Sequence, residues 1–193
     1  MPKTVEPVVQ QGALAGMGQP ELPASEHLIL RPWKEADVPS IVEAYAVADI
    51  QEWNLRTMDA DEAHEWIESW SATWEAETDA CWAIARRSDG SVVGRIALRQ
   101  ISLAAGSADV TYWVLPNGRR QGAASEAARS VTRWAFENVG LHRLDLHHSV
   151  RNAASCGVAI RAGFDLEATL QSYLKHADGW HDVHLHALIN RNS

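Results

Sequence analysis

The chain has 193 residues, of which 46% are hydrophobic and 22% are charged, and its formal net charge is −8. This length suits one domain with a full core. The acidic charge argues against nucleic acid as a partner, because phosphates need a basic surface; it fits a cationic amine substrate, or solubility alone. No apolar run reaches the ~18 residues of a membrane span and no secretory signal is present, so we expect a cytoplasmic protein without a membrane partner.

The first 24 residues are rich in glycine and proline and show no apolar period. Such a segment predicts a flexible N-terminal tail that is dispensable for folding, ahead of a single domain over residues 25–193. Apolar spacing and turn residues then predict a strand, two helices and three strands, at residues 27–31, 38–47, 60–77, 81–85, 92–101 and 108–114. The last three strands are expected to form an antiparallel meander.

Three of the nine tryptophans, Trp66, Trp70 and Trp74, recur every four residues in the second predicted helix. This spacing places them on one helix face. The stripe is typical of a core or of a surface between two copies of the chain, so a homodimer is one arrangement that it allows. An aromatic wall for the acceptor substrate, extended by Trp53, would show the same pattern.

The second half predicts a strand–loop–helix–strand unit. A polar, basic loop over residues 115–122 follows the meander. The elements after the loop are a helix, a strand, a helix capped by Asn152 and two strands, at residues 123–138, 143–150, 152–163, 166–174 and 183–189. The order of elements is therefore that of a mixed α/β fold.

The segment over residues 119–124, Arg-Arg-Gln-Gly-Ala-Ala, joins a strand to the start of a helix. A helix N-terminus binds anions, because its first N–H groups have no partner in the helix. Gly122 leaves room for a pyrophosphate to approach the backbone, and Arg119 and Arg120 supply positive charge. A surface turn with two solvated arginines has the same composition. The segment matches neither a P-loop nor the Gly-x-Gly-x-x-Gly dinucleotide pattern.

This segment resembles the Arg/Gln-x-x-Gly-x-Gly/Ala signature of the GNAT acyltransferase superfamily, with Arg119, Gly122 and Ala124 at its three defining places. Further segments are similar, in the same order, to the RimJ/RimL-like N-acetyltransferase branch. They are residues 28–37, 109–114, 122–127, 141–144, 152–155 and 163–164. The resemblance covers residues 27–190, and the ordered set of motifs is far more specific than any one of them.

The resemblance implies a GNAT-like α/β fold, in which a mixed, strongly twisted sheet flanked by helices splays open at the acyl-CoA site. It also implies an N-acyltransferase that moves an acetyl group from acetyl-CoA to a primary amine, on a protein N-terminus or a small molecule, by direct transfer in a ternary complex. The residues that it assigns to coenzyme binding are Trp113, Val114, Leu115, Arg119, Arg120, Gln121, Gly122, Ala123, Ala124, Ser125, Asn152 and Ser155.

Acyl transfer to an amine needs a base for the amine and a proton or positive field for the departing thiolate. Ser155 lies in the first turn of a helix, where its hydroxyl and the helix end would stabilise a thiolate. An ordinary first-turn serine is the alternative. Asp109 is the candidate base, because strand alternation places it on one face with Thr111 and Trp113. The family more often has glutamate here, so a structural or substrate-orienting carboxylate is an equal alternative.

Other interpretations of the donor, of the catalytic role and of metal binding remain open at this point. The donor could be succinyl-CoA or another acyl-CoA, and the protein could be a non-catalytic CoA-binding module, although Ser155 and Asn152 favour an enzyme. Cys81 and Cys156 predict reduced thiols rather than a disulfide framework or a zinc site. Asp182, His184 and His186 would share one strand face and form a three-ligand set. The match to the family's last strand implies structural or substrate-side roles instead, so we expect no metal.

Overall fold

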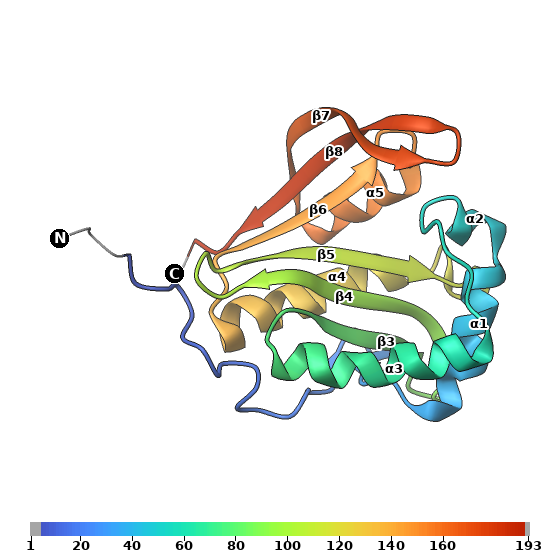
Figure 1. The fold of residues 1–193 in the computed structure, drawn as a ribbon, viewed down its shortest axis with the longest axis horizontal. Helices are drawn as coiled ribbons and strands as arrows, with labels where there is room; N and C mark the ends of the chain where they lie inside the picture. The colour runs from blue at the N-terminus through green and yellow to red at the C-terminus, as the bar shows by residue number, and fades with distance from the viewer. Residues whose placement is uncertain (1–4, 192–193) are drawn as a thin grey trace.

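The computed structural model describes residues 5–191. Within these residues, eight strands form a single sheet in the order β1-β2-β3-β4-β5-β6-β8-β7 (Figure 1). Only β5 and β6 pair in parallel among the neighbours in this sheet. The strands are β1 (Leu22–Pro23), β2 (Leu28–Arg31), β3 (Ala80–Arg86), β4 (Val92–Ser102), β5 (Ser107–Val114), β6 (Arg143–Ser149), β7 (Asp165–His176) and β8 (Gly179–Ile189).

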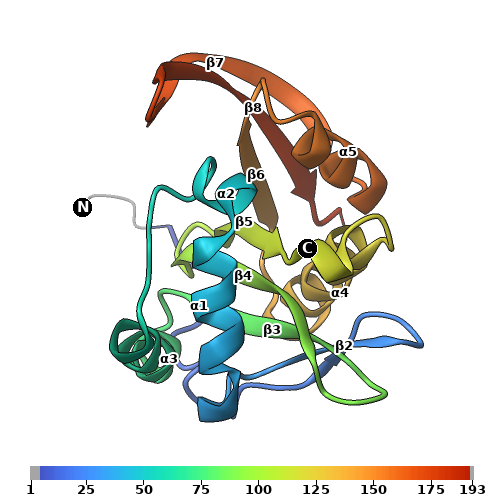
Figure 2. The same cartoon turned by 90° about the vertical axis from the view of Figure 1, so that its right-hand side faces the viewer.

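Helices cover both faces of the sheet. They are α1 (Val38–Ala46), α2 (Ala48–Gln51), α3 (Ala60–Glu75), α4 (Ala123–Trp134) and α5 (Ala153–Ala162). Figure 2 shows α1 and α3 on one face and α4 and α5 on the other. The predicted α/β class with a mixed sheet is confirmed. Three details differ from the prediction: α2 is an additional short helix, the last turn of the long helix is π-helical over Ala135–Val139, and the β7–β8 hairpin is longer.

The sheet opens between β5 and β6. These strands pair only at Ser107↔Arg143, Ala108↔Leu144 and Asp109↔Asp145. Beyond this point β6 turns away with β8 and β7, as Figure 1 shows. The predicted splay is therefore present, and the second half of β5 has one edge that no strand covers.

The tryptophan stripe of α3 lies in the core and not in a cavity. Trp74 is buried and stacks on Trp134 at 5.9 Å, and Trp70 is buried beside Trp66 at 5.3 Å. The Arg95 guanidinium lies 5.6 Å from the Trp70 ring and 5.8 Å from the Trp66 ring, so a residue of this chain already occupies those aromatic faces. These contacts favour a structural role over an acceptor wall for this stripe.

Residues 8–24 lie against the domain, in contrast to the loose tail that the sequence predicts; residues 1–4 lie outside the described part. Val9, Leu14 and Leu22 are buried. The buried Glu77 carboxylate accepts backbone hydrogen bonds from Gly12 at 2.7 Å, Leu14 at 2.6 Å and Ala15 at 3.3 Å. The segment shows no apolar period because backbone hydrogen bonds to buried groups hold it as an irregular strap.

Two core tryptophans also use this N-terminal segment as a partner. Trp74 donates its indole N–H to the Met17 carbonyl at 3.0 Å, and Trp82 donates to the Pro20 carbonyl at 2.8 Å. A buried indole N–H without an acceptor is costly, so the segment completes the core. Among residues 5–191, no helix has the length and apolar character needed to cross a membrane.

Candidate active site

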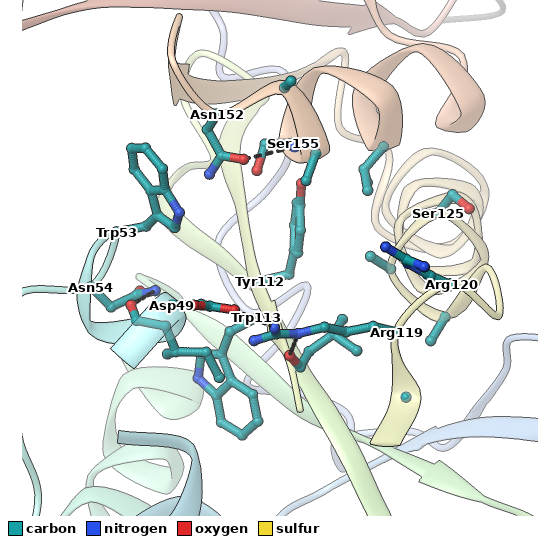
Figure 3. Close-up of a pocket in the computed structure, with 18 of the residues that line it drawn as sticks. Asp49, Trp53, Asn54, Tyr112, Trp113, Arg119, Arg120, Ser125, Asn152 and Ser155 are labelled. Carbon is teal, nitrogen blue, oxygen red and sulfur yellow. Dashed lines mark hydrogen bonds and ion pairs between the residues drawn. The ribbon is translucent and has the colours of Figure 1, made fainter. Parts of the chain in front are cut away.

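A pocket of about 910 Å³ lies where β5 and β6 diverge. Its walls come from α2 and the loop after it, β5, the loop before α4, and the N-terminal turns of α4 and α5 (Figure 3). Ten of the residues predicted from the sequence line it, namely Trp113, Val114, Arg119, Arg120, Gly122, Ala123, Ala124, Ser125, Asn152 and Ser155. The structure thus brings the two helix starts and the open strand edge together around one cavity.

The N-terminus of α4 forms the anion-binding end of this pocket. Gly122 is the cap residue, with a left-handed φ of +82°, and its carbonyl accepts the first helical bond from Glu126 at 2.9 Å. The N–H groups of residues 123–125 precede that bond and have no partner within the helix. Their side chains are small, and the Ser125 hydroxyl donates to the Gly122 carbonyl at 2.9 Å. The backbone here can donate several hydrogen bonds to a phosphate.

The two arginines of the loop have different tasks. Arg119 donates to the Val114 carbonyl at 3.1 Å and pairs with Asp49 at 2.6 Å, so it fixes the end of β5 to α2. Arg120 is exposed and extends toward the start of α4 in Figure 3. Arg120 is therefore the side chain that is better placed for a phosphate, while Arg119 shapes the pocket.

The open edge of β5 offers backbone hydrogen bonds to an extended ligand. The Leu115 N–H is bonded to the Val93 carbonyl on β4 at 2.9 Å. Alternation along the strand then directs the polar backbone groups of Tyr112 and Val114 away from β4, toward the split. An amide-bearing chain such as pantetheine could pair with this edge as an added strand does.

Ser155 and Tyr112 meet at the inner end of the pocket (Figure 3). Asn152 caps α5 by accepting the Ser155 N–H at 3.0 Å, which fixes Ser155 in the first helical turn. The Tyr112 hydroxyl is buried and finds no hydrogen-bond partner of good geometry within residues 5–191. Burial raises the pKa of Tyr112 to about 12, although the neighbouring Ser155 hydroxyl acts to lower it. The phenol therefore keeps its proton at neutral pH and can donate it.

Asp109 does not line the pocket. It lies on the opposite face of β5 from Tyr112, and its carboxylate is 3.6 Å from the His147 ring. Burial raises the pKa of Asp109; His147 acts to lower it, and Asp145 acts to raise it. This carboxylate faces the α1 and α3 side of the sheet, so a role as base requires that the amine approach from that side.

Leu115 and Gln121, which the resemblance also assigns to coenzyme binding, lie outside the pocket lining. Leu115 is buried against Ala44 and Ile50, so its side chain belongs to the core. The Gln121 amide donates to the Asn117 carbonyl at 3.1 Å and is exposed on the outer side of the loop. A six-residue motif identifies the loop, but the direction in which each of its side chains points depends on the geometry of the turn.

Sequence reasoning did not assign a role to several residues that line the pocket. Tyr112 lay inside a recognised strand, yet only the position of α5 shows which face of that strand meets a helix start. Asp49 and Asn54 come from α2 and the loop after it, a segment without a recognised motif. Trp53, which the sequence suggested as part of an acceptor wall, lies in the same loop and also lines the pocket. The ring of Trp53 lies 5.6 Å from that of His176 on β7, so α2 and the hairpin meet beside the pocket.

Known proteins with similar sequences and folds agree with this geometry. The family model described as an acetyltransferase (GNAT) domain matches residues 27–165. YoaA, an uncharacterized N-acetyltransferase of Bacillus subtilis, is 23% identical over 167 residues, which are 86% of this chain and 94% of that protein. The ribosomal-protein-serine acetyltransferase of Escherichia coli is 29% identical over 101 residues, or 52% of this chain and 56% of that protein.

The fold likeness extends over nearly the whole chain. RimL, a ribosomal L7/L12 alpha-N-protein acetyltransferase solved in complex with coenzyme A, has a TM-score of 0.80 at 21% identity and covers 90% of this chain and 100% of its own. This chain belongs to the GNAT acetyltransferase family. It is an acyl-CoA-dependent N-acetyltransferase, which transfers an acetyl group to an amine, as the resemblance implied.

Proposed function

We propose that the enzyme transfers an acetyl group from acetyl-CoA directly to the N-terminal amine of a polypeptide, in a ternary complex without a covalent acyl-enzyme. The observation that carries this proposal is the pocket itself, in which an anion-binding helix start, an open strand edge and the Ser155–Tyr112 pair line one cavity. Two relatives named as ribosomal-protein acetyltransferases support a polypeptide acceptor. The net charge of −8 suits a cationic amine.

Each group of residues has one task in this proposal. Acetyl-CoA supplies the activated thioester when it is bound. The backbone at residues 122–125 and Arg120 hold its pyrophosphate, and the β5 edge aligns its arm. Ser155, assisted by the protonated Tyr112, stabilises or protonates the departing thiolate. Asp109 accepts the amine proton from the opposite face of β5, through water or with His147.

The acceptor and donor can be tested together. Release of free thiol is followed with acetyl-CoA or succinyl-CoA, short peptides with different N-terminal residues, and small primary amines. We expect release with acetyl-CoA and an unblocked peptide, and none with the same peptide carrying an N-terminal formyl group. Release with small amines alone would contradict the polypeptide acceptor, and faster release from succinyl-CoA would contradict the donor.

Gly122→Asp should weaken coenzyme A binding about tenfold or more, because it places a carboxylate beside the bound pyrophosphate. Gly122→Asn is the matched control: both side chains tolerate a left-handed φ, and a Cβ at this position meets no atom closer than 3.4 Å. Calorimetry should show near-normal affinity for the asparagine variant. Equal affinities of the two variants would contradict a pyrophosphate at this helix start.

Asp109→Asn should reduce turnover about tenfold near pH 6 and progressively less toward about pH 9.5. At low pH the amine is protonated and needs a base, whereas at high pH free amine is abundant. Asp61→Asn is the control, because Asp61 is an exposed carboxylate on α3 and does not line the pocket. A pH–rate profile of Asp109→Asn that stays parallel to that of the parent enzyme would show that Asp109 only supports the strand.

A further inference from the structure

A second cluster of reactive side chains lies behind the pocket, between α5 and the sheet. It consists of His148 on β6, His184 and His186 on β8, and Cys156 on α5, and one donor atom of each lies within 4.8 Å of the others. The strands β6 and β8 are neighbours with His148 opposite His184 and Leu146 opposite His186. Alternation therefore directs all three imidazoles toward the helix that carries the thiol.

One nitrogen of each imidazole in this cluster lacks a hydrogen-bond partner among residues 5–191. Within the described chain, His148 Nε2, His184 Nδ1 and His186 Nε2 are buried and have no hydrogen-bond partner. His148 Nδ1 lies 2.8 Å from the Ser149 carbonyl, and His186 Nδ1 lies 3.4 Å from the Phe164 carbonyl. A carbonyl only accepts, so both Nδ1 atoms carry the proton and both Nε2 atoms present a bare lone pair.

This arrangement is unfavourable for a protein core but typical of a metal site. A buried acceptor that lacks a partner costs about 1–3 kcal/mol, and one thiol proton can serve only one of the three rings. Histidines that ligate metals usually donate their other N–H to a backbone carbonyl, as His148 and His186 do here.

We propose that His148, Cys156, His184 and His186 bind a divalent transition metal ion of the zinc type with tetrahedral geometry. One thiolate and three neutral imidazoles suit Zn²⁺, whereas Mg²⁺ and Ca²⁺ require oxygen ligands. On binding, the Cys156 thiol releases its proton to solvent and the thiolate ligates the ion. Because Cys156 follows Ser155, the bound ion would fix the start of α5 to β6 and β8 beside the pocket.

This set differs from the trio that strand alternation suggested. Asp182 is exposed and accepts the Ser172 N–H at 2.8 Å, so it lies outside the cluster. The third and fourth ligands come from β6 and α5 instead. The expectation of no metal rested on the match to the family's last strand, whereas β8 supplies only two of the four donors.

The test is a titration of the chelator-stripped full chain with Co²⁺. We expect one equivalent to bind, with the visible bands of tetrahedral cobalt and a near-ultraviolet thiolate-to-cobalt band, and Zn²⁺ to displace it. Cys156→Ser should abolish the thiolate band, and His184→Asn should weaken binding at least tenfold. Cys81→Ser and His64→Asn, which change the other thiol and an exposed histidine, should leave the spectrum intact.

A thiol-accessibility measurement covers the case in which a variant does not fold. In the parent protein, Zn²⁺ should slow the reaction of Cys156 with a disulfide reagent, while the buried Cys81 serves as an internal reference. Absence of a tetrahedral spectrum in excess Co²⁺, or a spectrum that Cys156→Ser and His184→Asn leave unchanged, would overturn the site. So would equal reactivity of Cys156 with and without Zn²⁺. None of these readouts depends on acetyl transfer.

Discussion

Replacing Ser155 with alanine is expected to lower kcat by about a hundredfold while the affinity for coenzyme A changes little. The hydroxyl lies in the first turn of α5 beside the buried phenol of Tyr112, at the inner end of the pocket. Proton donation by a positioned group typically contributes 10²–10⁴-fold, and here the helix start and Tyr112 remain to support the thiolate, so a loss of about 10²-fold is expected. Steady-state kinetics and calorimetry with coenzyme A separate the two effects.

Two further variants sharpen this test. Tyr112→Phe removes the phenol proton and keeps the ring, so a loss of kcat that does not add to that of Ser155→Ala would indicate that the two hydroxyls act as one unit. Ser71→Ala, on an exposed position of α3, should leave kcat unchanged. A normal kcat with a raised KM in Ser155→Ala would make Ser155 a binding residue alone.

The parts of the site that the sequence predicts well are those built from consecutive residues. Residues 119–125 could be recognised because a strand end, a left-handed glycine and a helix start follow one another in the chain. Asn152 and Ser155 can be predicted for the same reason, since a capping residue and the first-turn residue that it accepts from are three positions apart in the chain. Local chemistry alone dictates these features.

The remaining parts depend on contacts between distant segments. Alternation places Tyr112 and Asp109 on opposite faces of β5, but only the packing of α5 shows that the Tyr112 face meets the pocket. His148 and His184 are 36 positions apart, yet the register of β6 and β8 makes them direct neighbours. Such proximity follows from strand pairing, which no spacing rule within one element can reveal.

The N-terminal strap illustrates the same limit through a single carboxylate. Glu77 has a left-handed φ of +58°, a conformation that favours glycine after a helix. Glutamate occupies the position because its carboxylate satisfies three N–H groups of residues 12–15. Nothing in the sequence around Glu77 indicates partners more than 60 residues away, so a segment without an apolar period predicts a tail.

Removal of residues 1–23 should therefore lower Tm by about 10 °C or more. Truncation exposes the surface under Val9, Leu14 and Leu22, each contributing roughly 1.5–3 kcal/mol, and leaves the indole N–H groups of Trp74 and Trp82 without acceptors. The entropy of ordering the strap offsets part of this loss. A truncated protein that melts within a few degrees of the full chain would contradict the packing.

Glu77→Gln tests the same contact from the other side, and it should cost about 1–3 kcal/mol in the full chain because a buried charged acceptor is lost. In the protein lacking residues 1–23 the substitution should cost almost nothing, since its three donors are gone.

Burial by itself raises the pKa of Glu77, but the three backbone N–H groups outweigh it and hold the pKa below its ordinary value of 4.5. The contribution of the carboxylate is thus complete above pH 4.5 and lost as the pH falls through the lowered pKa. The difference in unfolding free energy between the parent and Glu77→Gln should accordingly be constant near neutral pH and shrink in acid; equal costs in the long and short proteins would mean that Glu77 acts through other contacts.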